Sequence, residues 1–175
     1  MKKRIVRVKL NEQSINDAIS ELRKYKRWLE KCTKKLLKTM ADEGFNIASA
    51  RFNQAIYDGT NDVTVVIEDR DDDKVAVIAI GGAVLFIEFG TGIRYEDNHP
   101  EAKDLGMMRG GYGHGLGKLQ KGWRYTGDPG SNGEIITSGK HEGEVHTYGN
   151  PANMAMYSTI KELEQHFEDM VRKVF

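Results

Sequence analysis

The chain has 175 residues, of which 39% are hydrophobic and 30% are charged, and its 26 basic and 26 acidic side chains cancel to a formal net charge of zero. This length and composition predict one polar globular domain over 1–175, and the balanced charge argues against a global electrostatic attraction to nucleic acid. The single cysteine excludes an internal disulfide and a cysteine-based zinc site, and no hydrophobic run is long enough to cross a bilayer.

The N-terminal region is basic, with thirteen Lys or Arg against four Asp or Glu over 1–40. Alternating apolar residues predict a short strand over 4–10, and Ser14 with Asp17 resembles a capping box that starts a helix. Apolar residues at steps of three and four then predict a long amphipathic helix with Cys32 on its buried side. The stripe consists of Ile15, Ala18, Ile19, Leu22, Tyr25, Leu29, Cys32, Leu36 and Met40.

Gly44 breaks or kinks this helical region, and a second apolar stripe continues it up to the turn at Asp58-Gly59. Three apolar runs follow and predict strands over 63–67, 75–80 and 83–89. Their short connections favour an antiparallel meander that the helices cover.

Glycine marks the next segment, since thirteen of the nineteen glycines fall within 106–149. Such backbone freedom is unusual in a compact core, so 93–148 is predicted to be an inserted loop or hairpin arm, with short strands over 123–125 and 134–137.

A last amphipathic helix is predicted with Asn150 as N-cap and Pro151 at its first position, and with Arg172 and Lys173 at its negative end. Its apolar stripe consists of Met156, Ile160, Leu163, Phe167, Met170, Val171 and Val174. The predicted fold is therefore α+β: two N-terminal helices, one of them long, an antiparallel sheet of three to four strands, the arm, and a C-terminal helix.

No pattern predicts catalysis, a cofactor or a metal site. Histidines at helical metal-ligand spacing are missing, so solvated loop histidines are favoured over a metal site built from His99, His146 and carboxylates. Gly90-Thr91-Gly92 does not lead into a helix, which favours a tight turn over a phosphate cradle. Glu88 has no second carboxylate at a fixed spacing, so the chain is not expected to be an enzyme.

Two alternative functions remain open. The basic helix suits a nucleic-acid-binding module in which lysines contact phosphates and Tyr25 and Trp28 stack on bases, although lysines that solvate an outer face, or meet an acidic subunit, explain it too. These lysines are Lys24, Lys31, Lys34, Lys35 and Lys38. A weaker alternative is a small toxin-like ribonuclease with His114 or His146 as its base.

Two short motifs carry a resemblance to a known family. The first is Glu88-Phe89-Gly90-Thr91-Gly92, followed by His99-Pro100, and the second is Gly149-Asn150-Pro151-Ala152. In this order, over 14–175, the chain resembles the tail-component family of neck and tail-completion proteins of long-tailed bacteriophages. The family's aromatic residue after Pro-Ala is absent, and Ala155 stands at or near its place.

The resemblance implies a non-enzymatic virion protein that assembles in the host cytoplasm into a ring, six-fold or a multiple, at the head–tail junction. Its implied partners are further copies and other neck, tail-terminator or tail-tube proteins; no membrane is involved, and DNA is met only as it passes through the neck. A glycine-rich arm that buries little surface alone is expected to fold against neighbours. The aromatic residues expected to anchor such contacts are Tyr112, Trp123, Tyr125 and Tyr148.

Overall fold

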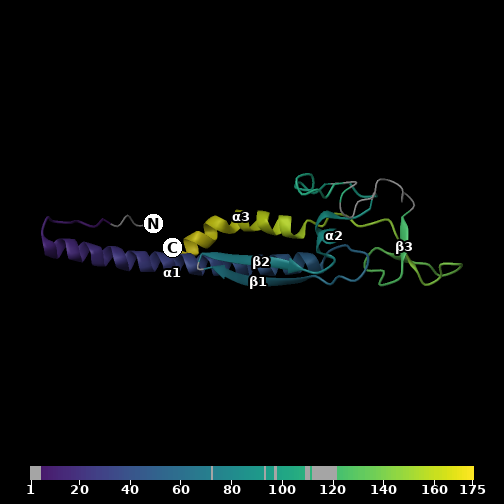
Figure 1. Ribbon diagram of the computed structural model, residues 1–175, viewed down its shortest axis with the longest axis horizontal. Helices are drawn as coiled ribbons and strands as arrows, with labels where there is room; N and C mark the ends of the chain where they lie inside the picture. The colour runs from purple at the N-terminus through teal and green to yellow at the C-terminus, as the bar shows by residue number, and fades with distance from the viewer. Residues whose placement is uncertain (1–4, 72, 93, 97, 109–110, 112–121) are drawn as a thin grey trace.

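The computed structural model describes residues 5–71, 73–92, 94–96, 98–108, 111 and 122–175, and it confirms the α+β class predicted from the sequence. A long helix forms the axis of an elongated molecule, with a second helix along one side, a hairpin along another, and loops with short strands at one end (Figure 1). The elements in chain order are α1 (Glu12–Asn53), β1 (Thr64–Asp71), β2 (Lys74–Ile80), α2 (Val84–Phe89), β3 (Trp123–Tyr125), β4 (Glu134–Ile135), β5 (Val145–Thr147) and α3 (Ala155–Val174).

α1 is one continuous helix of 42 residues where the sequence predicted two. Gly44 does not interrupt it, because this glycine lies where α1 meets both α3 and the hairpin. A Cβ at Gly44 would come within 3.1 Å of Leu163 Cδ1 and 3.5 Å of Val77 Cγ2. The glycine therefore serves close packing rather than a break in the helix.

The start of α1 also differs from the prediction. Asn11 is the N-cap, and its side chain accepts a hydrogen bond from the Ser14 N–H at 2.8 Å. The Ser14 hydroxyl instead accepts from the Lys9 N–H at 2.8 Å, so the predicted capping box of Ser14 and Asp17 is wrong. Residues 5–10 form no strand, which corrects the predicted strand in the part of 4–10 that the structure describes.

The hairpin of β1 and β2 is antiparallel, with Val65 opposite Ala79 and Ile67 opposite Val77. It packs against the C-terminal half of α1, where the main core forms. This core joins four elements and the turn before α2; its buried members are Ala48, Phe52, Val65, Ala83, Ile87 and Ala155.

The predicted third strand over 83–89 is wrong, because this segment forms the short helix α2. The Asp62 carboxylate accepts hydrogen bonds from the N–H groups of Gly82 at 2.8 Å and Ala83 at 2.9 Å, which turns the chain directly after β2. One helical turn then brings Ala83 and Ile87 to the same face, and both enter the core. A short apolar run fits a buried strand or a buried helix equally well, so the sequence pattern could not separate them.

The segment predicted as an arm contains a second antiparallel sheet with strand order β3-β5-β4. The strand predicted over 123–125 is confirmed, and the one predicted over 134–137 shortens to Glu134–Ile135. Val145 in the central strand is only 1% exposed. The single sheet of three to four strands is therefore wrong: the described residues form separate sheets of two and three strands.

α3 begins at Ala155, not at Pro151, and follows Met154 in the left-handed region (φ 50°). It runs antiparallel to α1, and its end lies where Phe175 meets Trp28 edge-on with ring centroids 5.9 Å apart. Arg172 and Lys173 occupy its last turn as predicted. The apolar stripe is only partly buried: the fully buried residues are Ala155, Thr159 and Met170, whereas Ile160 and Phe167 of the predicted stripe are exposed.

Candidate functional site

The two motifs that carry the family resemblance lie against each other. The Thr91 N–H donates to the Asn150 carbonyl at 2.9 Å, and the Asn150 N–H lies 3.2 Å from the Thr91 carbonyl and 2.9 Å from its Oγ1. The Asn150 side-chain amide also donates to Thr91 Oγ1 at 3.1 Å. Both residues are buried, so this paired contact, which we call the motif seam, joins segments 59 residues apart.

Glycine makes the motif seam sterically possible. Gly90 (φ 79°) and Gly149 (φ 98°) have conformations that other residues rarely adopt. A Cβ at Gly90 would lie 2.7 Å from the Ala152 nitrogen, and one at Gly149 would overlap the Thr91 carbonyl. The glycines of Gly90-Thr91-Gly92 therefore allow a close approach to the backbone of 148–152, whereas the sequence predicted a tight turn here.

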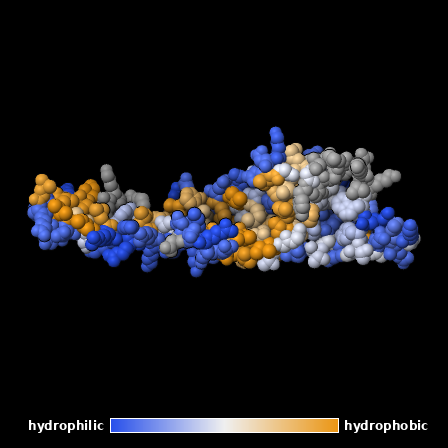
Figure 2. All heavy atoms as spheres, in the orientation of Figure 1, coloured by the Kyte–Doolittle hydropathy of each residue, from blue (hydrophilic) through white to orange (hydrophobic). Residues whose placement is uncertain are grey.

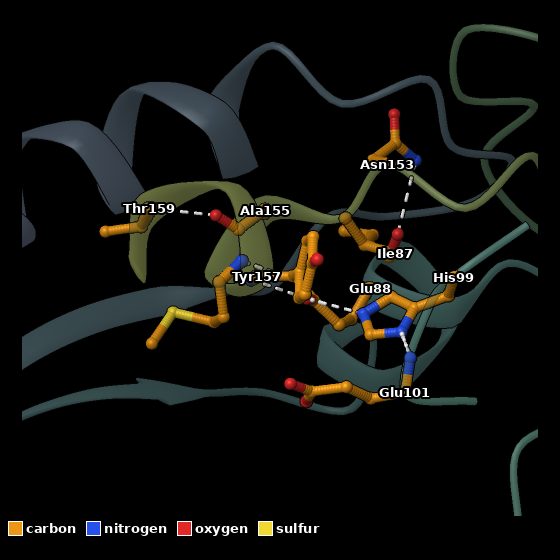
Figure 3. Close-up of polar contacts among 9 residues, drawn as sticks. Ile87, Glu88, His99, Glu101, Asn153, Ala155, Tyr157 and Thr159 are labelled. Atoms are coloured by element: carbon orange, nitrogen blue, oxygen red, sulfur yellow. Dashed lines mark hydrogen bonds and ion pairs between the residues drawn. The ribbon is translucent and has the colours of Figure 1, made fainter. Parts of the chain in front are cut away.

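Glu88 provides the cap that Asn150 was predicted to provide. Its carboxylate accepts from the N–H groups of Met156 at 2.7 Å and Tyr157 at 2.9 Å, which are orphan donors in the first turn of α3 (Figure 3). The predicted N-cap role of Asn150 is therefore wrong. A carboxylate at this end of a helix also interacts favourably with the helix dipole.

His99 lies beside Glu88, with its Nε2 3.2 Å from Glu88 Oε1 (Figure 3). Its other nitrogen, Nδ1, accepts from the Glu101 N–H at 3.2 Å, so Nε2 carries the proton and donates it to Glu88. The side chains of His99 and Glu88 are 2% and 7% exposed, and the rings of Phe89 and Tyr157 lie 4.3 Å and 5.3 Å from the imidazole centre.

The buried pair of His99 and Glu88 makes contacts that join parts of the fold. Both nitrogens of His99 and both oxygens of Glu88 already have partners in α3 or in the loop around His99. Pro100 beside it is exposed. In the part of the chain that the structure describes, no three His, Cys, Asp or Glu side chains gather closely enough to hold a metal ion.

Two asparagines tie the loop after α1 to the segment before α3. Asn150 Oδ1 accepts from the Asp58 N–H at 2.8 Å. The Asn153 side chain accepts from the Ile56 N–H at 2.9 Å and donates to the Ile56 carbonyl at 3.0 Å. The role of Asn153 was not predicted from the sequence, because an asparagine that pairs with a distant backbone has no local signature.

Asp58 was also missed as a buried group. Its side chain is nearly inaccessible to solvent, and the Thr147 hydroxyl donates a hydrogen bond to its Oδ2, while Oδ1 has no partner in the described structure. Burial raises the pKa of the Asp58 carboxyl, and the bond from Thr147 opposes this rise. The Asp-Gly turn was visible in the sequence, but its burial depends on β5.

Three of the four predicted interface aromatics are described by the structure, and all three contact their own chain. Trp123 lies against Gly92, where a Cβ would be 3.3 Å from the indole. The Tyr125 hydroxyl donates to the Asp128 carbonyl at 2.8 Å, and Tyr148 lies between the Arg94 guanidinium and the His146 ring, at 4.8 Å and 4.7 Å. All three are half-buried, so their contact with neighbours stays a prediction. Tyr112 and His114 lie outside the described residues.

On the basic helix, the two aromatics considered for base stacking contact each other. The rings of Tyr25 and Trp28 are stacked with centroids 5.5 Å apart, and Trp28 also touches Phe175. Lys24 forms an exposed ion pair with Glu21 at 3.1 Å. The lysines of this helix are exposed, as the solvated-face interpretation expects.

No protein-family model, curated protein or solved structure matches this chain. Among the described helices, none has both the length and the apolar character that a membrane crossing requires.

Proposed function

We propose that this chain is a structural protein of the bacteriophage neck or tail, which forms a ring at the head–tail junction and is not an enzyme. The observation that carries the proposal is the motif seam between Thr91 and Asn150. The two motifs resemble those of tail-completion proteins, and their polar atoms are used in joining α2, the arm and α3. Motifs whose polar atoms fix the relative positions of structural elements are what we expect in a structural subunit that presents a rigid surface to neighbouring subunits.

The distribution of surfaces also supports a subunit of an assembly. One end of the molecule is a projecting helix and the other is a loop-rich arm with a small sheet (Figure 1). Two different surfaces at opposite ends suit heterologous contacts, which close into rings when the rotation between copies allows. On this proposal Trp123, Tyr125 and Tyr148 contact the next copy, or a tail-terminator or tail-tube protein, and the protein resides in the virion.

The proposal is tested by assembly with the proteins encoded beside this gene. The full chain is mixed with the products of the flanking genes, and mass by light scattering is combined with negative-stain microscopy. We expect rings, or ring formation on addition of a connector or tail-tube protein. A chain that never forms rings and binds none of these partners would overturn the proposal.

A matched variant pair tests where those contacts lie. Trp123→Ala removes a half-buried arm aromatic, and Tyr25→Ala removes an exposed aromatic at the other end of the molecule. Loss of partner binding in the first but not the second, with unchanged circular dichroism, would support contact through the arm.

DNA binding is the outcome that would favour the main alternative. A salt-sensitive mobility shift of duplex DNA that disappears on charge reversal of Lys31, Lys34 and Lys35 indicates a nucleic-acid-binding module. The neck proposal expects no such shift for the isolated chain.

A further inference from the structure

The N-terminal part of α1 extends beyond α3 and the hairpin, and residues 5–10 run back alongside it (Figure 1). α3 ends where Phe175 meets Trp28, so residues 12–27 project past it (Figure 1). At about 1.5 Å per residue this projecting segment is about 24 Å long. Hydrophobic side chains gather at this end, on the side toward which α3 lies (Figure 2).

An apolar heptad seam runs along α1 through both the covered and the projecting part. Ile15, Leu22, Leu29 and Leu36 are seven residues apart, and Ala18, Tyr25 and Cys32 follow three of them at a step of three. The heptad seam of α1 is covered where α3 lies beside it, since Cys32 is only 8% exposed. Ile15, Leu22 and Tyr25 are 42%, 57% and 37% exposed, so the apolar side of α1 continues beyond the end of α3 as a partly exposed surface.

Charge along the projecting segment indicates what covers it. Residues 12–22 contain Glu12, Asp17 and Glu21 and no Lys or Arg, a net charge of −3. The next part, residues 23–31, has five basic side chains and one acidic one, Glu30, a net charge of +4. A helix that pairs antiparallel with a copy of itself sets the acidic part against the basic part twice, whereas a parallel pair sets like charges together.

We propose that the projecting segment of α1 binds the same segment of a second copy as an antiparallel helix pair, with Leu22 at the two-fold axis. In this register Ile15 of each copy faces Leu29 of the other. Such an isologous contact closes with two copies, so it describes the free protein, and it competes with the heterologous contact that this end of the molecule makes in the proposed ring.

Single cysteines test the register directly. In a Cys32→Ala background, Leu22→Cys lies on the seam and Ser20→Cys lies on the exposed opposite side. We expect Leu22→Cys to form a disulfide-linked dimer under mild oxidation at least about tenfold faster than Ser20→Cys, because only the seam brings two copies of one residue together. Equal rates for the two positions would overturn the proposal.

A mixed experiment separates antiparallel from parallel pairing. Chains with Ile15→Cys and chains with Leu29→Cys, in the same background, are combined and oxidised. The antiparallel register predicts that mixed dimers form faster than either homodimer. Faster coupling of Ile15→Cys chains with themselves indicates a parallel pair and contradicts the proposal.

Mass in solution provides a measurement free of cysteine chemistry. Sedimentation of the full chain at about 100 μM, where contacts of even modest affinity are occupied, should give a dimer. Leu22→Glu should give a monomer with unchanged circular dichroism, and Ser20→Glu should remain a dimer. A monomeric wild type, or a dimer that Leu22→Glu leaves intact, would exclude the pairing. Retained binding of Leu22→Glu to neck or tail proteins would leave the proposed function standing.

Discussion

Glu88 caps Met156 across 68 residues of sequence: its Oε2 lies 2.7 Å from the Met156 nitrogen, at the first turn of α3. The same carboxylate is held by His99 and lies at the end of α2. One buried side chain thus connects the end of one helix, the start of another and the loop between them. This connection means that the motif around Glu88 controls where α3 begins.

Glu88→Ala should lower the free energy of unfolding by at least about 2–3 kcal/mol, since each buried donor left without an acceptor costs about 1–3 kcal/mol. The N–H groups of Met156 and Tyr157 and the Nε2–H of His99 all lose their partner. Urea unfolding followed by circular dichroism measures the change. Glu101→Ala is the control, because its side chain is exposed nearby; an equal loss in both variants would contradict the capping role.

Two glycines with positive φ separate backbone strain from steric overlap. Gly139 (φ 90°) has nothing within 4 Å of a built Cβ, so Gly139→Ala should cost about 1–2 kcal/mol from its conformation alone. At Gly149 (φ 98°) the methyl group also overlaps the Thr91 carbonyl, which should add about 1–3 kcal/mol. Thermal unfolding compares the two variants. Similar losses of stability in the two variants would mean that the contact between Gly149 and Thr91 adjusts to the added methyl group without a further loss.

Stability should depend on pH through Asp58, because burial raises the pKa of its carboxyl above the ordinary value of 3.8. Between the ordinary pKa of the unfolded state and the raised pKa of the folded state, the folded protein binds more protons than the unfolded protein. The contribution of Asp58 to the free energy of unfolding therefore falls as pH rises through that interval. Asp58→Asn removes this dependence. The free energy of unfolding of Asp58→Asn relative to wild type should therefore improve as pH rises from about 4 to about 7.

The pH dependence of stability that arises from Asp62 has the opposite sign to that from Asp58, so Asp62 serves as the matched comparison. The N–H groups of Gly82 and Ala83 lower the pKa of the Asp62 carboxyl below 3.8. Its contribution is present above the unfolded pKa and is lost as pH falls through the folded pKa. Asp62→Asn should therefore be less stable than wild type at neutral pH, and the difference should shrink in acid. Parallel pH profiles for the two asparagine variants would refute both assignments.

Removal of residues 1–24 should leave the folded body intact. The buried residues of α1 begin at Cys32, so the free energy of unfolding should change by no more than about 1 kcal/mol, because helix turns without tertiary packing add little stability. Urea unfolding at low protein concentration, where copies are dissociated, measures this. Removal of residues 170–175 is the comparison: it takes away Met170, which is 3% exposed, and should lower stability clearly. A large loss on the N-terminal truncation would show that the projecting segment supports the core.

Local patterns predicted several elements because their signals lie within a few residues. These signals were the three- and four-residue apolar spacing of α1, the alternation over 63–67 and the apolar run over 75–80. The strand Trp123–Tyr125 was also predicted from its local sequence. Arg172 and Lys173 marked the end of α3 for the same reason. The motifs at 88–92 and 149–152 were also recognisable in the sequence, although the capping role predicted for Asn150 belongs to Glu88.

The wrong predictions have a common cause. Hydrogen bonds and packing contacts with distant segments determined the roles of these residues, and their sequence neighbours did not. Asn150-Pro151 has the residues of a helix start, but Asn150 pairs with Thr91 and Asp58, so the cap comes from Glu88. Gly44 has the signature of a break, but it fills the contact between α1, Leu163 and Val77.

By itself the sequence determined the α+β class, the amphipathic character of α1 and α3 and the need for glycine at Gly90, since periodicity and glycine conformation act over a few residues. Only the tertiary structure decided that 83–89 is a helix, that α1 is continuous and that Glu88 caps α3. Those outcomes depend on distant partners, such as Met156 for Glu88, 68 residues away, and Leu163 for Gly44. Burial makes an unpaired donor at such a contact costly.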